Sequence, residues 1–373
     1  MDNRMGWILA MEEVEKVEDK DTYFIDHEIC SEVRIPGVLD YGNGSLMCAL
    51  FQEEDKNGLF TYAIRLKHVY KEYKFDESKY SKNGYYFKDG LIGELMAIFS
   101  VYFQARFYLK ATVSGELTSK SVRSRYENDF RYVRPNPYRN FEMFTAYQKR
   151  NWANEDGLKA FLDRMRSIDQ EYHQNLTHAF FWYAEAIKEI GLDSQMFFIK
   201  MVSAVEALLK LLPKSADALD KKLTKLYKEK KFEPTEVQEI NNWLENRKIR
   251  HRFILFFEKY AIGFCKGGKR KPAHGYIQKE DVNDYAGKIY DARSAYLHSG
   301  KPMYLSQDMA MENAKCWDLD GSSGMMADRK KFDDKEKLPR TRWFERIVNH
   351  CLKKICATLA ANDPKRKSPA HHS

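Results

Sequence analysis

The segment 290–300, YDARSAYLHSG, holds two residues whose types and spacing suit a chemical step. Arg293 stays cationic, and a guanidinium can hold a phosphate and stabilise negative charge that develops on it. His298 lies five positions later, and an imidazole with an ordinary pKa of about 6.5 can accept or donate a proton near neutral pH. The pair is therefore suited to cleaving RNA, which carries its own nucleophile in the 2′-hydroxyl group.

The spacing of the pair does not establish a site by itself. The chain has ten histidines and many arginines, so chance matches are expected. Arg166 and His173 match a similar spacing, and no matching helix surrounds them. On the residues alone, Arg293 and His298 can also be ordinary polar groups that bond backbone and carboxylates at a helix end.

The helix predicted over 281–298 has two different faces. The face expected to pack in the core carries Val282, Tyr285, Ile289, Ala292 and Tyr296. The opposite face carries Tyr290, Arg293, Ser294, Leu297 and His298. We expect this second face to contact another surface, such as a second copy of the chain. Gly300 can end the helix in a left-handed conformation, which places His298 in the last turn.

These residues resemble the signature helix of HEPN domains, in which an arginine and then a polar residue precede a histidine. In this chain, Ser294 is the polar residue that follows the arginine. The segment is most similar to the Apea-like branch, where a tyrosine precedes Arg-Ser and a glycine soon follows the histidine. The earlier segment MFFIKMVSAVEALLKLL is similar to an apolar helix of that branch, with Glu206 in its Glu-Ala-Leu-Leu. The resemblance covers about 168–361, and the N-terminal part resembles no family.

The resemblance implies a helical, metal-independent ribonuclease without a cofactor, often dimeric, that serves in prokaryotic antiviral defence or as a toxin. Arg293 and His298 would be catalytic, and a homodimer would form through their helix face. Ser294, Tyr290 and Glu206 would support them. Glu206 either pairs with Arg293 or lies at a solvated edge, and Tyr290 either touches RNA or packs in the dimer. The trigger would be a phage or a regulatory signal.

Two basic segments are candidates for binding RNA. The glycine-rich loop 266–276 precedes the predicted helix, and residues 120–150 combine cations with tyrosines. The residues singled out are Lys266, Lys269, Arg270, Lys271, Arg131 and Arg134. The alternative for 266–276 is a solvated loop. The alternative for 120–150 is a junction that packs on both domains.

The composition indicates a globular cytoplasmic protein. The chain has 373 residues, 43% hydrophobic, with a formal net charge of +8. Its six cysteines form no CxxC pair, which favours reduced thiols. No signal peptide is recognised, and the most apolar helix-like segment, 89–111, is too polar to span a membrane and is expected to be a buried core helix.

The order of elements predicts an α+β fold in two parts. Strands are expected over 22–35, 45–51 and 59–70, with an Asn-Gly turn in 40–45, followed by the helix 89–111 on the sheet. Residues 1–155 would form a mixed α/β domain of unknown role, a possible sensor or regulator. Residues 158–361 would form an all-α up-and-down bundle with an insertion at 300–340, and 362–373 a disordered basic tail. The expected helices are 158–191, 193–213, 215–230, 234–261, 280–298 and 341–361.

Three functional hypotheses remain open on the sequence. The first is an RNA endonuclease, the second a non-catalytic HEPN module that dimerises and binds RNA or a nucleotide. The third is a helical interaction protein in which the Arg–His pair is incidental. Motifs of dinucleotide binding, of phosphate-binding loops, of zinc proteases and of serine hydrolases are absent from the sequence. No pattern of metal ligands is recognised either.

Overall fold

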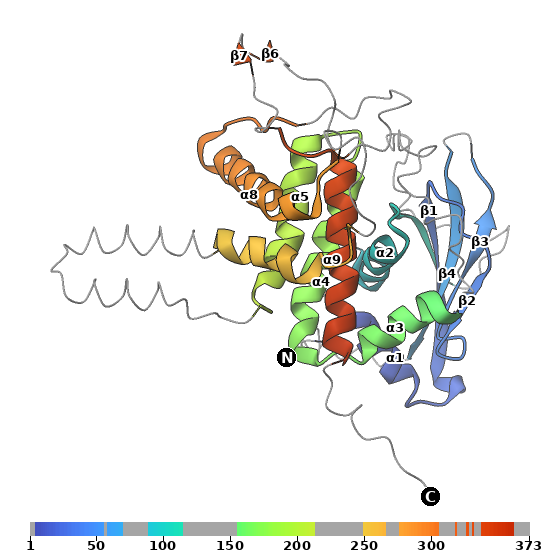
Figure 1. Cartoon of the computed structure of the whole chain (residues 1–373). Coiled ribbons are helices and arrows are strands. Elements are labelled where there is room, and N and C mark those ends of the chain that lie inside the picture. The colour runs from blue at the N-terminus through green and yellow to red at the C-terminus, as the bar shows by residue number, and fades with distance from the viewer. Residues whose placement is uncertain are drawn as a thin grey trace, which may run out of the picture.

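A computed structural model shows that the chain combines helices with a five-stranded antiparallel sheet, so the predicted α+β class is confirmed. Figure 1 shows the sheet on one side of the molecule and most of the helices on the other. The structure describes residues 4–55, 58–69, 89–114, 155–212, 249–265, 276–305, 318, 326–327, 330–331 and 337–361.

The sheet has the strand order β2-β3-β4-β1-β5, and each neighbouring pair is antiparallel. Its strands are β1 (Thr22–Ser31), β2 (Val38–Tyr41), β3 (Leu46–Gln52), β4 (Phe60–Val69) and β5 (Tyr108–Ser114). The predicted strands are confirmed, although β1 ends at Ser31 rather than at 35. The predicted turn joins β2 to β3, and Asn43 and Gly44 both have positive φ there.

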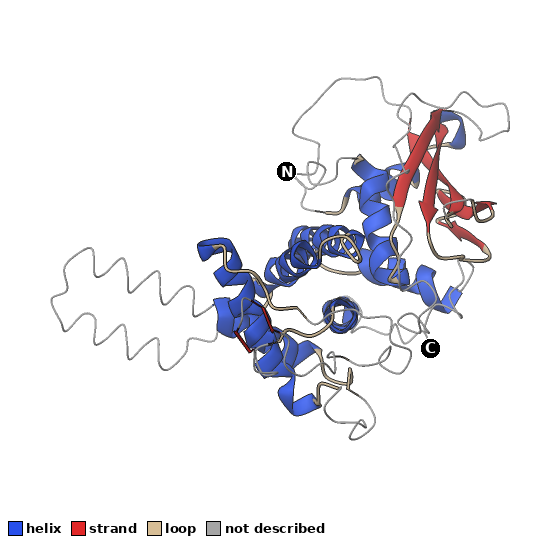
Figure 2. Cartoon of the chain, turned by 90° about the horizontal axis from the view of Figure 1, so that it is seen from above, coloured by secondary structure: helices blue, strands red, loops and turns tan. Residues whose placement is uncertain are grey.

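The helix predicted over 89–111 is shorter than expected. Helix α2 (Gly90–Phe103) ends where Gln104 adopts a left-handed conformation, and the chain then returns as the edge strand β5. The prediction was wrong for its last third, because an unbroken apolar run does not distinguish a buried helix from a buried strand. Its burial is confirmed, since α2 lies between the sheet and the other helices (Figure 2).

The helix predicted over 158–191 is in fact two helices. After a π-helical turn, α3 (Ala160–Arg166) is followed by α4 (Gln170–Lys188), and the Asp169 carboxylate accepts a hydrogen bond from the Glu171 N–H at the start of α4. The other described helices are α1 (Gly6–Val14), α5 (Ser194–Leu209), 249–260, α8 (Val282–Ser299) and α9 (Thr341–Ala361). The helix predicted over 215–230 and the start of the one predicted over 234–261 lie outside the described residues.

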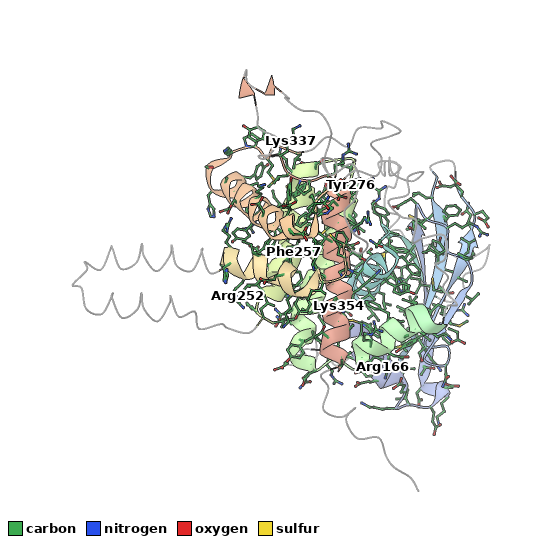
Figure 3. All side chains as sticks on the ribbon, viewed as in Figure 1. Arg166, Arg252, Phe257, Tyr276, Lys337 and Lys354 are labelled. Carbon is green, nitrogen blue, oxygen red and sulfur yellow. The ribbon has the colours of Figure 1, made fainter. Side chains whose placement is uncertain are left out.

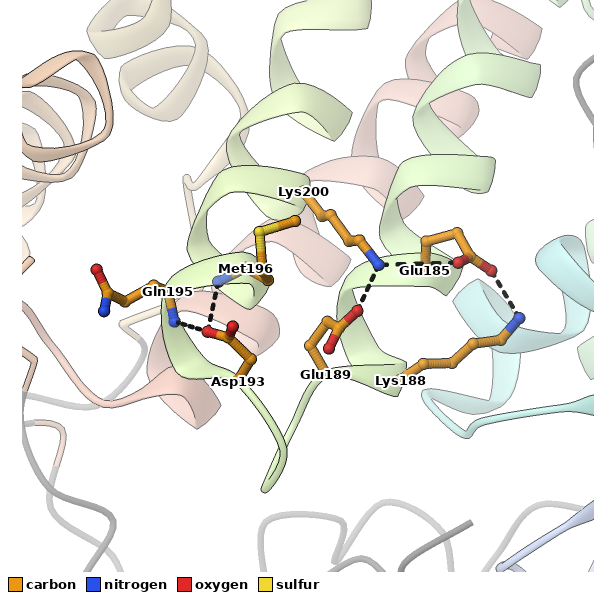
Figure 4. Close-up of polar contacts among 7 residues, drawn as sticks. All are labelled: Glu185, Lys188, Glu189, Asp193, Gln195, Met196 and Lys200. Atoms are coloured by element: carbon orange, nitrogen blue, oxygen red, sulfur yellow. Dashed lines mark hydrogen bonds and ion pairs between the residues drawn. The ribbon is translucent and has the colours of Figure 1, made fainter. Parts of the chain in front are cut away.

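The hairpin of α4 and α5 is fixed at its turn by side chains (Figure 4). Asp193 caps the start of α5, since its carboxylate accepts hydrogen bonds from the N–H groups of Gln195 and Met196. Lys200 of α5 forms ion pairs with Glu185 and Glu189 of α4. The apolar residues that recur at helical spacing along α5 and just after it are all buried: Phe197, Met201, Ala204, Val205, Leu208 and Leu212.

One continuous hydrophobic core joins the sheet, α2 and the later helices. Phe198 of α5 stacks on Phe344 of α9, with ring centroids 5.2 Å apart. A buried polar network crosses the same region, because the Glu345 carboxylate of α9 accepts hydrogen bonds from Tyr183 of α4 and from Gln104. The network fixes α9 against both α4 and the end of α2.

The predicted division near residue 155 stays a prediction, since 115–154 lie outside the described residues. The predicted disordered tail, 362–373, also lies outside the described residues and stays a prediction. Of the insertion 300–340, the described parts include a small pairing of β6 (Met326–Ala327) with β7 (Lys330–Lys331) and a bridge between Leu305 and Leu338. Among the described residues, no disulfide bond is formed by the cysteines, which are Cys30, Cys48, Cys265, Cys351 and Cys356.

The start of α1 depends on a buried carboxylate from α2. Glu94 accepts hydrogen bonds from the N–H groups of Gly6 and Trp7, at 3.2 and 2.8 Å. These are N–H groups that a helix leaves unbonded at its start. Burial raises the pKa of Glu94 to about 7, although the two backbone hydrogen bonds oppose the rise.

The substitution Glu94→Gln tests this arrangement through its pH dependence. A carboxyl whose pKa is higher in the folded state binds more protons there, so it lowers stability as pH rises from about 4.5 to about 7. The glutamine cannot ionise. We therefore expect the free energy of unfolding of E94Q minus that of the wild type to increase by about 3 kcal/mol between pH 4.5 and pH 8. Urea denaturation at both pH values measures it, and parallel pH profiles would contradict it.

Candidate active site

Helix α8 ends as the sequence predicts. Gly300 has φ of 66°, and its N–H donates to the carbonyl of Tyr296 at 3.0 Å. This bond, from a glycine in the left-handed conformation to the carbonyl four residues earlier, is the helix ending known as the αL motif, and the N–H of Lys301 also donates to the carbonyl of Ala295 at 3.4 Å. His298 therefore lies in the last turn of α8, and its side chain is exposed.

The packed face of α8 largely agrees with the prediction. Val282 and Ile289 are buried, and the other members of the stripe are half-buried against the core: Tyr285, Ala292 and Tyr296. Tyr290 corrects the prediction, because it belongs to the opposite face yet is only 7% exposed. Its ring packs on Phe253 of the helical segment 249–260, with centroids 5.3 Å apart. Tyr290 thus packs within its own chain.

Arg293 forms an ion pair with Glu206 of α5, and the distance between Nη2 and Oε2 is 2.9 Å. The Arg293 side chain is 18% exposed and that of Glu206 24%, so both lie in the seam between α5 and α8. Burial raises the pKa of Glu206, and the charge of Arg293 opposes this rise. The structure therefore shows that Glu206 pairs with Arg293 and does not lie at a solvated edge without a partner.

The Nε of Arg293 is buried and has no hydrogen-bond acceptor among the described residues. The pair with Glu206 therefore uses only part of the guanidinium, which has five N–H groups to donate. Ser294 beside it is half-buried.

Arg293 and His298 do not project in the same direction. Five residues of helix separate them by roughly 7.5 Å along the axis and by about 140° around it. Arg293 reaches into the seam with α5, whereas His298 is exposed at the helix end beside Leu297, which is 49% exposed. A phosphate that meets both side chains must lie over the C-terminal end of α8.

An ion pair that was not predicted holds α8 to the segment 249–260, on which Figure 3 labels Arg252 and Phe257. Arg250 forms two hydrogen bonds with Asp291, at 2.7 and 2.8 Å. A Cβ at Gly287 would lie 2.8 Å from the Arg250 guanidinium, so a side chain there requires Arg250 to move. In the sequence, this close contact was indicated by Gly287, a glycine inside a predicted helix.

The second Arg–His match has a structural role. Arg166 forms a bidentate ion pair with Glu15, at 2.9 and 3.0 Å. His173 is buried, its Nδ1 accepts a hydrogen bond from the Met5 N–H, and its Nε2 bonds the carbonyl of Ile168. The two residues therefore connect α1 to α3 and α4.

The residues predicted to bind RNA lie outside the described part of the chain: Lys266, Lys269, Arg270, Lys271, Arg131 and Arg134. Over the ranges that the structure describes, no group of three or more histidine, cysteine or acidic side chains is arranged to hold a metal ion. Among the described helices, none combines the length and the apolar character that a membrane span requires. The chain matches no family model, no curated protein and no solved structure.

The ion pair can be tested by substituting Glu206 with glutamine. We expect Glu206→Gln to lower the free energy of unfolding by roughly 1–2 kcal/mol, because it leaves the charge of Arg293 partly buried without its counter-ion. Chemical denaturation measures the loss.

Asp291→Asn is the matched control. It breaks another arginine–carboxylate ion pair on the same helix, but the Arg250 and Asp291 side chains are 41% and 55% exposed. An exposed pair contributes little, so we expect a loss of at most about 0.5 kcal/mol. Equal losses in the two variants would show that the seam does not shield the Glu206–Arg293 pair.

Proposed function

We propose that the chain is a metal-independent RNA endonuclease of the HEPN type, with Arg293 and His298 as its catalytic residues. The observation that carries the proposal is the ion pair of Glu206 with Arg293, which holds a guanidinium near an exposed histidine at a fixed helix end. The helices of residues 158–361 would be the HEPN-like bundle, acting in the cytoplasm in antiviral defence or toxin-like growth arrest.

In the proposed reaction, the 2′-oxygen of one nucleotide attacks the adjacent phosphorus. A bond forms between the 2′-oxygen and phosphorus, and the bond from phosphorus to the 5′-oxygen breaks. A base removes the 2′-hydroxyl proton and an acid protonates the departing 5′-oxygen, and an imidazole can serve in either role. Arg293 stabilises the charge on the crowded phosphate, while Glu206 positions Arg293. The products end in a 2′,3′-cyclic phosphate and a 5′-hydroxyl group.

A homodimer would complete this chemistry by supplying a second histidine. One His298 would then act as the base and the other as the acid. The exposed Leu297 beside His298 supports an apolar contact at this helix end.

A non-catalytic HEPN module is the alternative, and one observation favours it. Arg293 is already engaged by Glu206 and is largely buried, as in a structural ion pair. A protein of this kind would dimerise and bind RNA or a nucleotide without cutting it.

Cleavage of a mixed RNA pool in EDTA separates the two functions. We expect the wild type to produce 2′,3′-cyclic phosphate ends, and His298→Ala to lower the rate by on the order of 10²–10⁴, the usual range for loss of a general acid or base. Gel analysis with end-group identification measures both.

His251→Ala is the matched control, because His251 is also an exposed histidine on a helix, in the segment 249–260. It should cleave at the wild-type rate. Equal cleavage by the wild type and His298→Ala would contradict the role of His298. The absence of cleavage from every variant, with RNA binding retained, would favour the non-catalytic module.

A further inference from the structure

The solvent-facing side of α9 is cationic. The one acidic residue of this helix, Glu345, is buried and bonded to Tyr183. The charged groups that reach the surface are Arg346, Lys353 and Lys354, and His350 lies among them. His350, Lys353 and Lys354 follow Arg346 by four, seven and eight residues, which places all four along one side of the helix.

Aromatic rings lie between these cations. The Phe264 ring is half-buried and lies 5.8 Å from the Arg346 guanidinium and 5.8 Å from the His350 ring. The His350 Nε2 bonds the carbonyl of Ile262 at 3.2 Å, which holds this loop against α9. Lys353 bonds the carbonyl of Tyr102 at 2.9 Å, and its ammonium lies 5.6 Å from the Tyr102 ring.

Arg164 of α3 continues the cationic side toward the end of α9. Helix α3 packs directly against α9, and the charge of Arg164 opposes the rise that burial causes in the pKa of the Cys356 thiol. Figure 3 shows α3 beside the lower half of α9 and Lys354 on the front of that helix. The half-buried Arg164 side chain extends the cationic side beyond the helix itself.

We propose that this surface binds single-stranded RNA. It is called the α9 surface below and consists of Arg164, Phe264, Arg346, His350, Lys353 and Lys354. Cations attract the phosphates, and a partly exposed ring between them can stack on a base. The pattern of cations with interleaved rings favours single-stranded RNA over an acidic protein or a lipid surface.

The inference rests on the proposed function only in that RNA is the substrate. Helix α8 begins beside α9, where the Tyr285 and Trp343 rings lie 6.3 Å apart. His298 lies thirteen residues after Tyr285, which corresponds to roughly 20 Å of helix. One strand of RNA several nucleotides long can therefore occupy the α9 surface and reach the end of α8.

The test is the binding of a fluorescein-labelled 20-nucleotide oligouridylate to the full chain, measured by anisotropy at several salt concentrations. All proteins carry His298→Ala, so that the probe is not cut. We expect the triple variant R164Q, R346Q and K354Q to raise Kd by 10- to 100-fold. The slope of log Kd against log salt should fall by about 2, since each phosphate contact to a single strand contributes about 0.7.

Two further variants control for folding and for total charge. The triple variant K16Q, K20Q and R34Q removes the same charge from exposed residues elsewhere and should bind as the parent does. Thr358→Lys adds a cation one turn beyond Lys354 and should lower Kd, a gain that unfolding cannot produce.

Equal binding by the parent and the first triple variant would overturn the inference, as would equal weakening by the two triple variants. It would also be overturned if the parent bound vesicles of phosphatidylserine but not the RNA. These results are distinguishable from failure of the proposed function, because the binding assay requires no cleavage. A chain that binds RNA through the α9 surface but never cuts it would retain this inference and lose the catalytic one.

Discussion

The burial of α5 is the constraint on which the candidate site depends. This helix packs against α4, α8 and α9, so its apolar side chains are almost completely removed from water. A carboxylate on such a helix needs a partner, because burying an unpaired charge costs several kcal/mol. Glu206 obtains that partner from α8, in Arg293. The same ion pair therefore satisfies the partly buried carboxylate and holds α8, the helix that carries His298 in its last turn.

The sheet is joined to this arrangement through α2 and α9. Glu345 accepts hydrogen bonds from α4 and from the end of α2, and Asn349 bonds the carbonyl of Val101 at 2.7 Å. These buried polar contacts have few alternative partners, so they specify how α9 lies against its neighbours. The exposed cations of α9 are consequently presented on a rigid support, which suits the binding of an extended anionic strand.

The parts that could be predicted from the sequence depend on local rules. Asp193 and Gly300 act at the ends of α5 and α8 through contacts within a turn of each helix. The apolar stripe of α5 follows from helical periodicity alone. The sequence did not decide whether Glu206 pairs with Arg293, because the spacing of residues within each helix does not show which faces of two distant helices meet. The resemblance to HEPN domains remains part of the proposal.

The errors arose where a distant segment decides the outcome. The segment after Phe103 forms the strand β5 because it pairs with the edge of β1, and no residue in the segment predicts this pairing. Tyr290 is buried because Phe253, far away in sequence, covers it. The α9 surface was missed for a different reason. Its spacing is visible in TRWFERIVNHCLKKICATLAA, but only the burial of Glu345 shows that the exposed side has no acidic residue from that helix.

The most direct test of the central claim is to compare an RNA with its 2′-O-methyl counterpart as substrates, in EDTA, for the wild-type chain. The claim is that the end of α8 promotes attack by the substrate's own 2′-hydroxyl group. It predicts cleavage of the RNA to 2′,3′-cyclic phosphate ends and no cleavage of the methylated strand, which lacks the nucleophile. Cleavage of both strands at similar rates would contradict it, because a different nucleophile would then be attacking the phosphate.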